Sequence, residues 1–371
     1  MIEREASVTA YPARLEALTS IRFLMALGVV LFHFQLVWAF PEGSSGLLNR
    51  ARLGVDAFFI LSGFVLAHVY LQPGAPFSYR RFLAARFARI YPAHLFVLLG
   101  VLSMVATAGL LGIELQPGRF NVPDFFQTLL LIQAWFPRHD QVFWNGPSWS
   151  LSAEWFAYLA FPVFALVATA LRRRPLILIG LSLVLFSLLD AFYQAVFGLI
   201  LPRAEDSMGF FRIIPEFLFG IGLYFFGVRV SIGRGPAIAF ALLSGAALLY
   251  AMQIGADDRL IVFLCGPFIL ACSFLSKTGA EGVLGHRWLV FMGDCSYALY
   301  LVHLPLLLAW RNVAAKLLGL PDDYLMGLPE QAVVLTVTLI AAVAIYCLVE
   351  RPARPWIRSV LNTDRLARTA D

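Results

Sequence analysis

Ionisable side chains lie inside long apolar stretches of this chain, and His33 is the one best suited to general-base chemistry. It follows Arg22 by eleven residues. Eleven residues at about 100° each return to within ~20° of the same helix face, and a rise of about 1.5 Å per residue separates the two side chains by about 16 Å. We therefore expect Arg22 at the cytoplasmic rim and His33 near the middle of the membrane. A neutral imidazole there could accept a proton from a hydroxyl or amine. Packing against a neighbouring helix, with Arg22 as a topology anchor, is an equally weighted alternative.

Two carboxylates are expected where apolar segments meet the outer face of the membrane. Asp56 lies in the run Gly-Val-Asp-Ala-Phe-Phe-Ile-Leu-Ser-Gly-Phe. The favoured interpretation is that its carboxylate caps a helix N-terminus. The alternative is that it orients a histidine. Glu154 shares one helix stripe with Ser150 and Tyr158, because the three are spaced by four residues. Trp149 and its neighbouring tryptophans alone would indicate only a membrane interface. A carboxylate inside a span is costly, so Glu154 is a candidate functional residue.

Two further pairs of polar residues are spaced by three, which places each pair on one helix face. Arg86 and Arg89 precede Tyr91 at the start of the third apolar segment. Two arginines in this arrangement could hold a phosphate group, or they could serve only to anchor the segment at the cytoplasmic side. Tyr300 and His303 form the second pair, which adds another polar face to the ninth apolar segment.

The composition indicates which solvent surrounds these residues. Of 371 residues, 60% are hydrophobic and only 14% are charged, and the mean hydropathy is +0.79. Soluble proteins have about 25% charged residues, and disordered chains combine low hydrophobicity with high net charge, so both classes are excluded. The four cysteines lie in apolar runs without metal-ligand spacing, so neither a disulfide scaffold nor a metal site is expected. The isoelectric point near 9.1 does not indicate nucleic acid, because the basic residues are scattered between apolar stretches.

Apolar segments of about 20 residues are long enough to cross about 30 Å of hydrocarbon as helices. Ten such segments predict an all-α, polytopic membrane protein: residues 23–40, 54–72, 90–112, 149–171, 176–200, 211–228, 236–254, 260–276, 289–310 and 331–349. A shorter stretch, 124–136, is expected to be re-entrant or interfacial. With ten crossings, most of the 28 basic residues fall on the side of the N-terminus, so the positive-inside rule places both termini in the cytoplasm.

These segments divide the chain into three expected parts. They are a cytoplasmic leader (1–17), a transmembrane domain (18–355) and a short basic cytoplasmic tail (356–371). The first apolar run is long and follows a charged leader, which does not fit a cleavable signal peptide. No segment after residue 349 is long enough for a second soluble domain, so none is expected.

Five short motifs occur in a fixed order along the chain, and together they resemble the membrane-bound acyltransferase 3 family of bacterial O-acyltransferases. They are Arg22 with His33, Gly-Val-Asp56-x-Phe-Phe-x-Leu-Ser-Gly-Phe, Arg86-x-x-Arg89-Ile-Tyr-Pro, Trp149-Ser-Leu-x-x-Glu154 and Ser296-Tyr-x-Leu-Tyr-x-x-His303-x-Pro. The resemblance extends from about residue 18 to residue 355. It implies ten helices in the bacterial inner membrane and transfer of an acyl group, usually acetyl, from acyl-CoA in the cytoplasm. The implied acceptor is a hydroxyl of a glycan, a lipid-linked saccharide or a small molecule.

The resemblance also implies roles for the residues that match its motifs. The catalytic group would consist of the base His33 together with Arg22, Asp56 and Glu154. The donor, acetyl-CoA by family default, would contact Arg86, Arg89 and Tyr91. The acceptor or the pore would be lined by Trp149, Ser150, Tyr300 and His303. The resemblance implies no bound cofactor, and the expected partners are membrane lipid, acyl-CoA and the acceptor, with the oligomeric state left open.

Two other classes of protein fit parts of this pattern. In a proton-coupled transporter or exporter, the same buried His, Asp and Glu residues would form a proton relay. Discontinuous helices in matched halves would favour that class, and the sequence does not indicate them. A polyprenol-dependent glycosyltransferase would need an acidic pair near a large outer segment, whereas the outer loops expected here are short.

Overall fold

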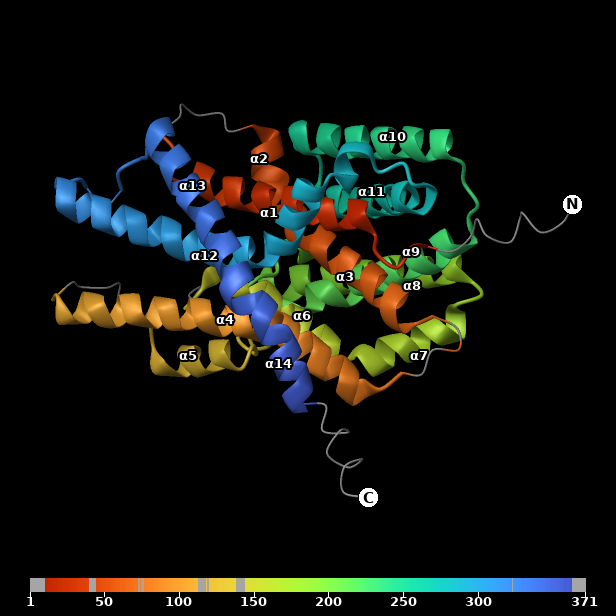
Figure 1. Ribbon diagram of the computed structural model, residues 1–371, viewed down its shortest axis with the longest axis horizontal. Coiled ribbons are helices and arrows are strands. Elements are labelled where there is room, and N and C mark those ends of the chain that lie inside the picture. The colour runs from red at the N-terminus through yellow and green to blue at the C-terminus, as the bar shows by residue number, and fades with distance from the viewer. Residues whose placement is uncertain are drawn as a thin grey trace, which may run out of the picture.

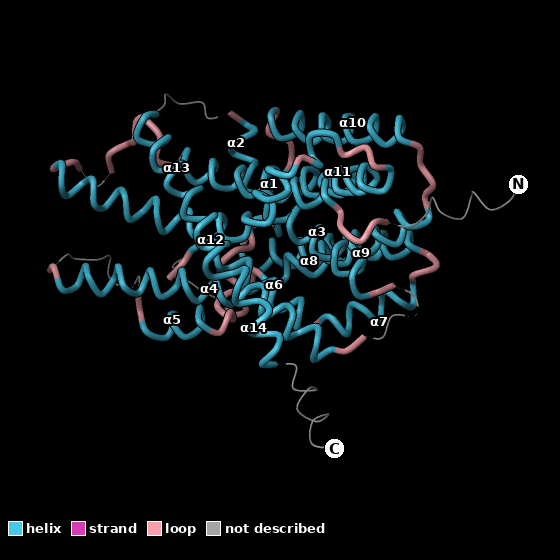
Figure 2. The backbone as a smooth tube through the Cα atoms, in the orientation of Figure 1, coloured by secondary structure: helices cyan, strands magenta, loops and turns pink. Residues whose placement is uncertain are grey.

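The computed structural model describes residues 11–39, 45–72, 74, 77–112, 118, 120–137, 144–321 and 323–361. Within these residues the protein is a bundle of helices without a strand, and an isolated bridge pairs Trp38 with Met326. Figure 2 shows the helices packed against one another and joined by loops. The expected all-α class is therefore confirmed for the described part of the chain.

The helices follow the apolar segments of the sequence (Figure 1). Their bounds are α1 (Glu16–Gln35), α2 (Gly46–Arg50), α3 (Gly54–Tyr70), α4 (Tyr79–Leu110), α5 (Val122–Leu129), α6 (Trp149–Leu159), α7 (Phe161–Leu171), α8 (Pro175–Phe197), α9 (Phe210–Arg229), α10 (Arg234–Gln253), α11 (Asp258–Thr278), α12 (Arg287–Leu318), α13 (Leu328–Ile345) and α14 (Arg351–Leu361). Short 3₁₀ turns are η1 (Ala51–Leu53), η2 (Gly146–Ser148), η3 (Leu201–Arg203) and η4 (Gly282–Gly285), and a π-helical turn, η5 (Tyr346–Glu350), joins α13 to α14.

Nine helical segments in the described part of the chain are long and apolar enough to cross a membrane. A tenth span results if α6 and α7 are taken together, although their axes are bent by 61°. The bend follows Leu159, and Pro162 at the start of α7 has no N–H to continue the hydrogen-bond ladder of α6. The expected ten crossings agree with this arrangement, and the expected span over 149–171 is a broken one. The cytoplasmic placement of both termini stays a prediction.

Helix α4 begins eleven residues before the apolar segment expected at 90–112. Its 32 residues give a length of about 48 Å, which exceeds the hydrocarbon thickness of about 30 Å. The first turns of α4 therefore carry Arg86 and Arg89 on a rigid helix that continues into the membrane. Pro92 lies inside the helix, where it removes one backbone hydrogen bond without ending the helix.

The short apolar stretch 124–136 does not form a span. Its helix, α5, has eight residues, which correspond to about 12 Å. Leu131 then adopts a positive φ of 58°, and the chain turns. Phe125 and Leu129 pack against a small cluster that includes Leu98 of α4 and Trp144, and Figure 1 shows α5 beside α4. A helix of eight residues is too short to cross the hydrocarbon, which agrees with the prediction, and the re-entrant or interfacial placement of this stretch stays a prediction.

Two close helix crossings set the positions of the polar side chains. Gly63 of α3 lies against α9, where an added Cβ would come within 2.0 Å of the carbonyl oxygen of Phe217. Gly293 of α12 lies against α1, where an added Cβ would come within 2.0 Å of the carbonyl oxygen of Thr19. Small residues let helix backbones approach closely in a membrane, where van der Waals packing holds helices together. Side chains further along these two helix pairs can therefore meet at bonding distance.

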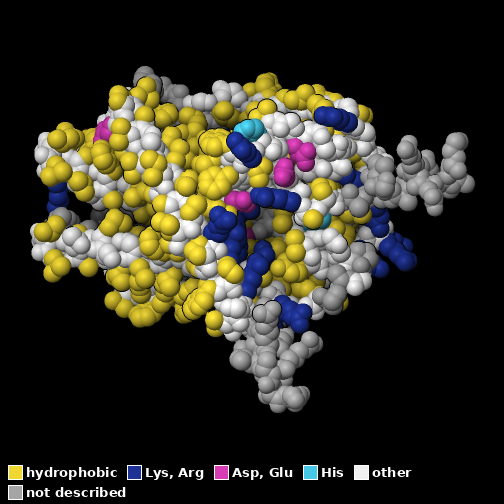
Figure 3. Space-filling view, in the orientation of Figure 1, with side chains coloured by type: hydrophobic (Ala, Val, Ile, Leu, Met, Phe, Trp, Pro, Cys, Tyr) yellow, Lys and Arg dark blue, Asp and Glu magenta, His cyan; other side chains and the backbone are white. Residues whose placement is uncertain are grey.

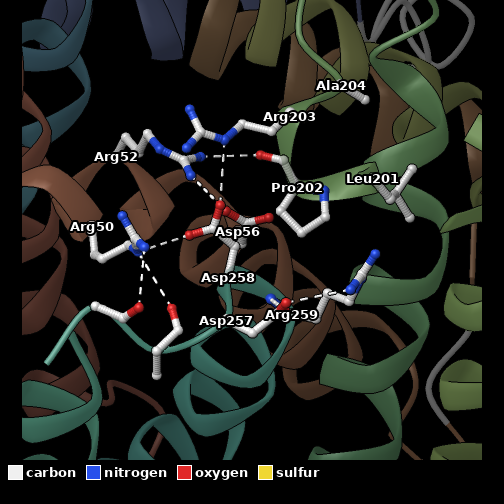
Figure 4. Close-up of polar contacts among 12 residues, drawn as sticks. Arg50, Arg52, Asp56, Leu201, Pro202, Arg203, Ala204, Asp257, Asp258 and Arg259 are labelled. Carbon is white, nitrogen blue, oxygen red and sulfur yellow. Dashed lines mark hydrogen bonds and ion pairs between the residues drawn. The ribbon is translucent and has the colours of Figure 1, made fainter. Parts of the chain in front are cut away.

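A cluster of ion pairs holds the chain that leads into α3. Asp258, at the start of α11, is 5% exposed and pairs with Arg50 at 3.0 Å, with Arg52 and with Arg203 at 3.3 Å. Figure 4 shows the three arginines pointing toward this carboxylate from different segments of the chain. Because Arg50 and Arg52 immediately precede α3, the cluster fixes the helix end that carries Asp56.

Apolar side chains cover much of the surface, as contact with lipid requires. Leu110, Leu242 and Val333 are examples of large hydrophobic side chains that are more than half exposed. Figure 3 shows a broad apolar area over the end of the bundle formed by α4, α5, α12 and α13. Basic and acidic side chains gather near the middle of the same face, where α14 crosses the bundle (Figure 3).

Candidate active site

A cavity of about 120 Å³ lies between α1, α3, α4, α6 and α12, and we call it the central cavity. Its polar lining comes from side chains that are far apart in the sequence. These are Arg22, Ser62, Arg86, Arg89, Ser150, Glu154, Tyr158, Ser296, Tyr297 and Tyr300. The structure thus brings six of the sequence-predicted site residues to one place.

Three arginines form one end of the central cavity. Arg89 donates to Glu350 of the η5 turn at 2.7 Å, but its Nη2 is buried without a hydrogen-bond partner in the described part of the chain. Arg86 lies over the ring of Tyr70, and its buried Nε also has no partner among these residues. Arg22 lines the same cavity and donates no hydrogen bond to any described residue. Buried N–H groups without acceptors are costly, so this end of the cavity is suited to an anion.

The Glu350 carboxylate binds Arg89 from one side and Arg354 of α14 from the other, both through Oε1. Glu350 is fully buried, and it is the last residue of a π-helical turn, a feature that often occurs at functional sites. Glu350 was not among the predicted site residues, because it comes just after the last apolar segment and belongs to none of the five motifs. The carboxylate fixes the side chain of Arg89 at the cavity wall.

Glu154 connects two helices across the cavity. Its Oε1 accepts hydrogen bonds from Ser62 of α3 at 2.7 Å and from Tyr158 at 2.5 Å. Ser150, Glu154 and Tyr158 all line the cavity, as their spacing on one helix face predicts. From Ser150 to Tyr158 the rise of α6 is about 12 Å, which gives the length of this polar wall.

Tyr300 closes the other end of the central cavity. Its hydroxyl accepts from Ser150 at 2.9 Å and donates to the carbonyl oxygen of Pro147 at 3.0 Å. Its backbone carbonyl, on the other side, lies 2.7 Å from Nδ1 of His303. The two candidate histidines therefore lie just beyond Tyr300, at this end of the cavity.

His33 and His303 form a hydrogen-bonded pair behind Tyr300. Nε2 of His303 lies 3.1 Å from Nδ1 of His33, and the two ring centroids are 4.9 Å apart. Nδ1 of His33 also lies 2.9 Å from the carbonyl oxygen of Val29 on its own helix. His303 is fully buried, whereas His33 keeps a partly exposed side chain.

The carbonyl partners determine which nitrogen of each ring carries the proton. A carbonyl oxygen only accepts hydrogen bonds, so Nδ1 is the protonated nitrogen of both histidines. In neutral His303, Nε2 is then an acceptor, and it shares the Nδ1–H of His33 with Val29. These protons are assigned from the hydrogen-bond network. His33 is left with an unprotonated Nε2, the atom able to accept a proton from a substrate hydroxyl.

Asp56 binds Arg212 of α9 instead of capping a helix. Its two oxygens accept from Arg212 at 2.7 and 2.5 Å, and both side chains are buried. The favoured interpretation as an N-cap is wrong, because the N-cap of α3 is Leu53 and makes no side-chain cap hydrogen bond. The close crossing of α3 and α9 explains the difference, since it places a guanidinium group within reach of the carboxylate. Arg212 was missed, although a charge two residues into the apolar segment 211–228 was a visible signal.

Tyr91 and Trp149 lie outside the central cavity. Tyr91 stacks on Phe87, one helical turn earlier, with ring centroids 4.4 Å apart. The Trp149 ring lies 5.1 Å from the guanidinium carbon of Arg212 and packs edge-on against Phe59. Neither side chain is among those lining the cavity. Stacking on the Phe87 ring accounts for the position of Tyr91. Packing against the guanidinium group of the buried ion pair accounts for the position of Trp149.

The described residues contain no group of three or more His, Cys, Asp or Glu side chains arranged to hold a metal ion.

One buried carboxylate without a partner among the described residues lies apart from the cavity. Glu216, one turn after Arg212 on α9, is 1% exposed, and neither of its oxygens has a hydrogen-bond partner in the described structure.

Comparison with known proteins identifies relatives along nearly the whole chain. The chain is 31% identical over 313 residues to acyltransferase MdmB of Streptomyces mycarofaciens, and the match covers 78% of each protein. It is 27% identical over 345 residues to BcsY of Komagataeibacter xylinus, whose name describes a membrane-bound transacylase, with 87% of this chain and 78% of the relative covered.

More distant relatives carry more specific names. The peptidoglycan O-acetyltransferase OatA of Listeria monocytogenes serovar 1/2a is 23% identical over 331 residues, which cover 78% of this chain. The chain spans about half the length of that relative, 49%. No solved structure matches the chain.

The family described as "Acyltransferase domain" matches residues 15–347, which contain every residue of the central cavity and both histidines. All five sequence motifs lie within this range. The chain belongs to the membrane-bound acyltransferase 3 family, and it is an O-acyltransferase with many membrane-spanning helices.

Proposed function

We propose that the protein transfers an acyl group, acetyl in the first instance, from acyl-CoA to a hydroxyl of an acceptor molecule. The observation that carries this proposal is the hydrogen-bond chain from Tyr300 through His303 to His33, which leaves Nε2 of His33 unprotonated. A neutral imidazole held in one tautomer is the usual general base for a hydroxyl. The names of the OatA relatives describe O-acetyl transfer, which supports the choice of acetyl.

The donor is proposed to enter at the arginine end of the central cavity. The unpaired Nε of Arg86 and Nη2 of Arg89 would bind the diphosphate of acyl-CoA, and Arg22 would add a third positive charge. The narrow pantetheine arm would then follow the polar wall from Tyr158 to Ser150. This path of about 12 Å would bring the thioester to Tyr300, beside the histidine pair.

The proposed reaction moves one proton and one acyl group. The acceptor hydroxyl gives its proton to Nε2 of His33, and its oxygen bonds to the thioester carbonyl carbon. The carbon–sulfur bond breaks, and the leaving thiolate of CoA takes the proton from His33. During this step the imidazolium is stabilised by the hydrogen bond from its Nδ1–H to His303 and Val29. General-base catalysis supplies about 10²–10⁴-fold, so positioning of the two substrates must supply the rest.

The remaining predicted residues receive supporting roles. Glu154, held by Ser62 and Tyr158, would position the donor in the cavity. The ion pair between Asp56 and Arg212 would hold α3 against α9 and so keep the cavity wall in place. For the acceptor we retain a glycan, a lipid-linked saccharide or a small molecule, and for the location the bacterial inner membrane with cytoplasmic donor binding.

A test uses purified protein in proteoliposomes with acetyl-CoA labelled in the acetyl group, and it measures released CoA thiol and labelled acceptor. We expect both products to form together in the wild type and to fall about 10²–10⁴-fold in His33→Ala. His286→Ala is the matched control, because His286 is exposed at the start of α12. A transporter would move a solute without releasing thiol, and acetyl transfer that persists in His33→Ala would contradict the assigned base.

A further inference from the structure

A second cavity, of about 470 Å³, lies where the first turns of α1 and α12 meet the η5 turn, and we call it the peripheral pocket. Its volume lies within the range of about 300–1,000 Å³ that is common for small-molecule sites. The charged side chains around it are Arg14, Glu16, Arg287, Asp294 and Arg351. It is separate from the central cavity, and the reaction described above uses none of these residues.

Two guanidinium groups of the peripheral pocket are available to a ligand. Arg14 is already bound to Asp294 at 2.9 Å. Arg287 and Arg351 are exposed, and neither makes a hydrogen bond or ion pair with another residue in the described ranges. Two free guanidinium groups beside one pocket suit a phosphate monoester, which carries close to two negative charges and accepts several hydrogen bonds.

The apolar part of the pocket is suited to a flat ring. Val290 and Tyr346 are buried, and the ring of Phe291 meets that of Tyr346 edge-on with centroids 5.9 Å apart. Glu16 lines the pocket beside them and, within the described structure, accepts no hydrogen bond. A carboxylate of this kind can accept from the exocyclic amine of a purine. Phosphate, aromatic ring and amine together describe an adenosine monophosphate group.

The peripheral pocket adjoins the arginine end of the central cavity. On α12, Asp294 of the pocket is two residues before Ser296 of the cavity. On η5, Tyr346 of the pocket is one turn before Glu350, which binds Arg89 of the cavity wall. A molecule that occupies both sites therefore needs a phosphorylated nucleoside at one end and a narrow chain at the other.

We propose that the peripheral pocket binds the adenosine 3′-phosphate end of acyl-CoA. The 3′-phosphate lies between Arg287 and Arg351, and the adenine packs against Phe291 and Tyr346. This inference rests on the proposed function, in which Arg86 and Arg89 bind the diphosphate. The pocket then selects acyl-CoA over donors that carry the same thioester without a 3′-phosphate.

The experiment compares acetyl-CoA with 3′-dephospho-acetyl-CoA as donors. For the wild type we expect a KM about tenfold higher for the dephospho donor, which corresponds to one charge-assisted hydrogen bond at the low end of its range. Arg287→Ala and Arg351→Ala should raise the KM for acetyl-CoA to a similar degree, leave kcat unchanged and remove the difference between the two donors. Arg173→Ala is the control, because it removes an exposed positive charge in the turn between α7 and α8. This variant should behave as the wild type.

Different results separate this inference from the proposed function. Equal KM values for the two donors in the wild type, or a difference that survives in both arginine variants, would overturn the nucleotide site and leave the acyltransferase mechanism intact. Turnover of neither donor would contradict the proposed function. Calorimetric binding of adenosine 3′,5′-bisphosphate tests the pocket without turnover. We expect Arg287→Ala to weaken it about tenfold, and binding that is equal in wild type and variant would overturn the inference.

Discussion

His303 is predicted to act on the reaction through His33, and the structure gives the size of that effect. Replacing His303 by Leu removes the acceptor of the 3.1 Å hydrogen bond from Nδ1 of His33 and keeps a side chain that fills much of the same space. Nδ1 of His33 retains its second acceptor, the carbonyl oxygen of Val29 at 2.9 Å. The tautomer of His33 is therefore preserved, and its Nε2 can still accept a proton.

The expected loss is the difference between two hydrogen bonds. Between neutral rings the bond from His33 to His303 is worth about 0.5–1.5 kcal/mol, and once His33 is charged in the transition state it is worth about 1.5–3 kcal/mol. The difference of about 1–1.5 kcal/mol corresponds to a decrease in kcat of about 5- to 13-fold. The loss of the base itself in His33→Ala should be far larger, about 10²–10⁴-fold.

The assay is the initial rate of thiol release at saturating acetyl-CoA and acceptor, with product formation measured in parallel. His303→Gln is the matched variant, because its side-chain carbonyl can accept from Nδ1 of His33 and should restore most of the rate. The reasoning is refuted if His303→Leu is as inactive as His33→Ala, since His303 would then have chemistry of its own. A kcat equal to that of the wild type in His303→Leu would refute it as well.

Two predictions concern stability and are checked by thermal unfolding in detergent. Arg212→Leu leaves the buried carboxylate of Asp56 without its partner, so we expect the free energy of unfolding to fall by about 3–5 kcal/mol. Adding Asp56→Leu in the same chain should recover part of this loss. An Arg212→Leu variant as stable as the wild type would contradict the ion pair. Gly63→Ala places a methyl group 2.0 Å from the carbonyl oxygen of Phe217 and should separate α3 from α9, whereas Gly180→Ala, with no atom within 4 Å of the added Cβ, should be neutral. Equal unfolding temperatures for the two glycine variants would argue against the close crossing.

Much of the candidate site was predictable because an apolar chain makes each charge informative. The helical spacing of Ser150, Glu154 and Tyr158 placed them on one face, and all three line the central cavity. Arg22, Arg86 and Arg89 were recognised from their positions at the ends of apolar segments. Such arguments need only the periodicity of a helix, which is a local property.

Partners from distant parts of the chain were not predictable in the same way. Asp56 was assigned to a helix cap, because the neighbouring residues gave no sign of Arg212, 156 residues later. Glu350 belongs to no predicted motif, although it holds Arg89, 261 residues earlier. The peripheral pocket combines the first turns of α1 and α12 with the η5 turn, and no local pattern connects them.

The sequence by itself determined the solvent, the helical class and the family, because hydropathy, helical period and motif order are written along the chain. The tertiary structure decided which charges are paired and which stay free. It paired Asp56 with Arg212 and left nitrogens of Arg86 and Arg89 without acceptors. It also placed Nε2 of His303 beside Nδ1 of His33, which gives the candidate base a second hydrogen-bond acceptor besides Val29 of its own helix. The physical reason is that the state of a buried charge depends on its neighbours in space, and close helix crossings choose those neighbours.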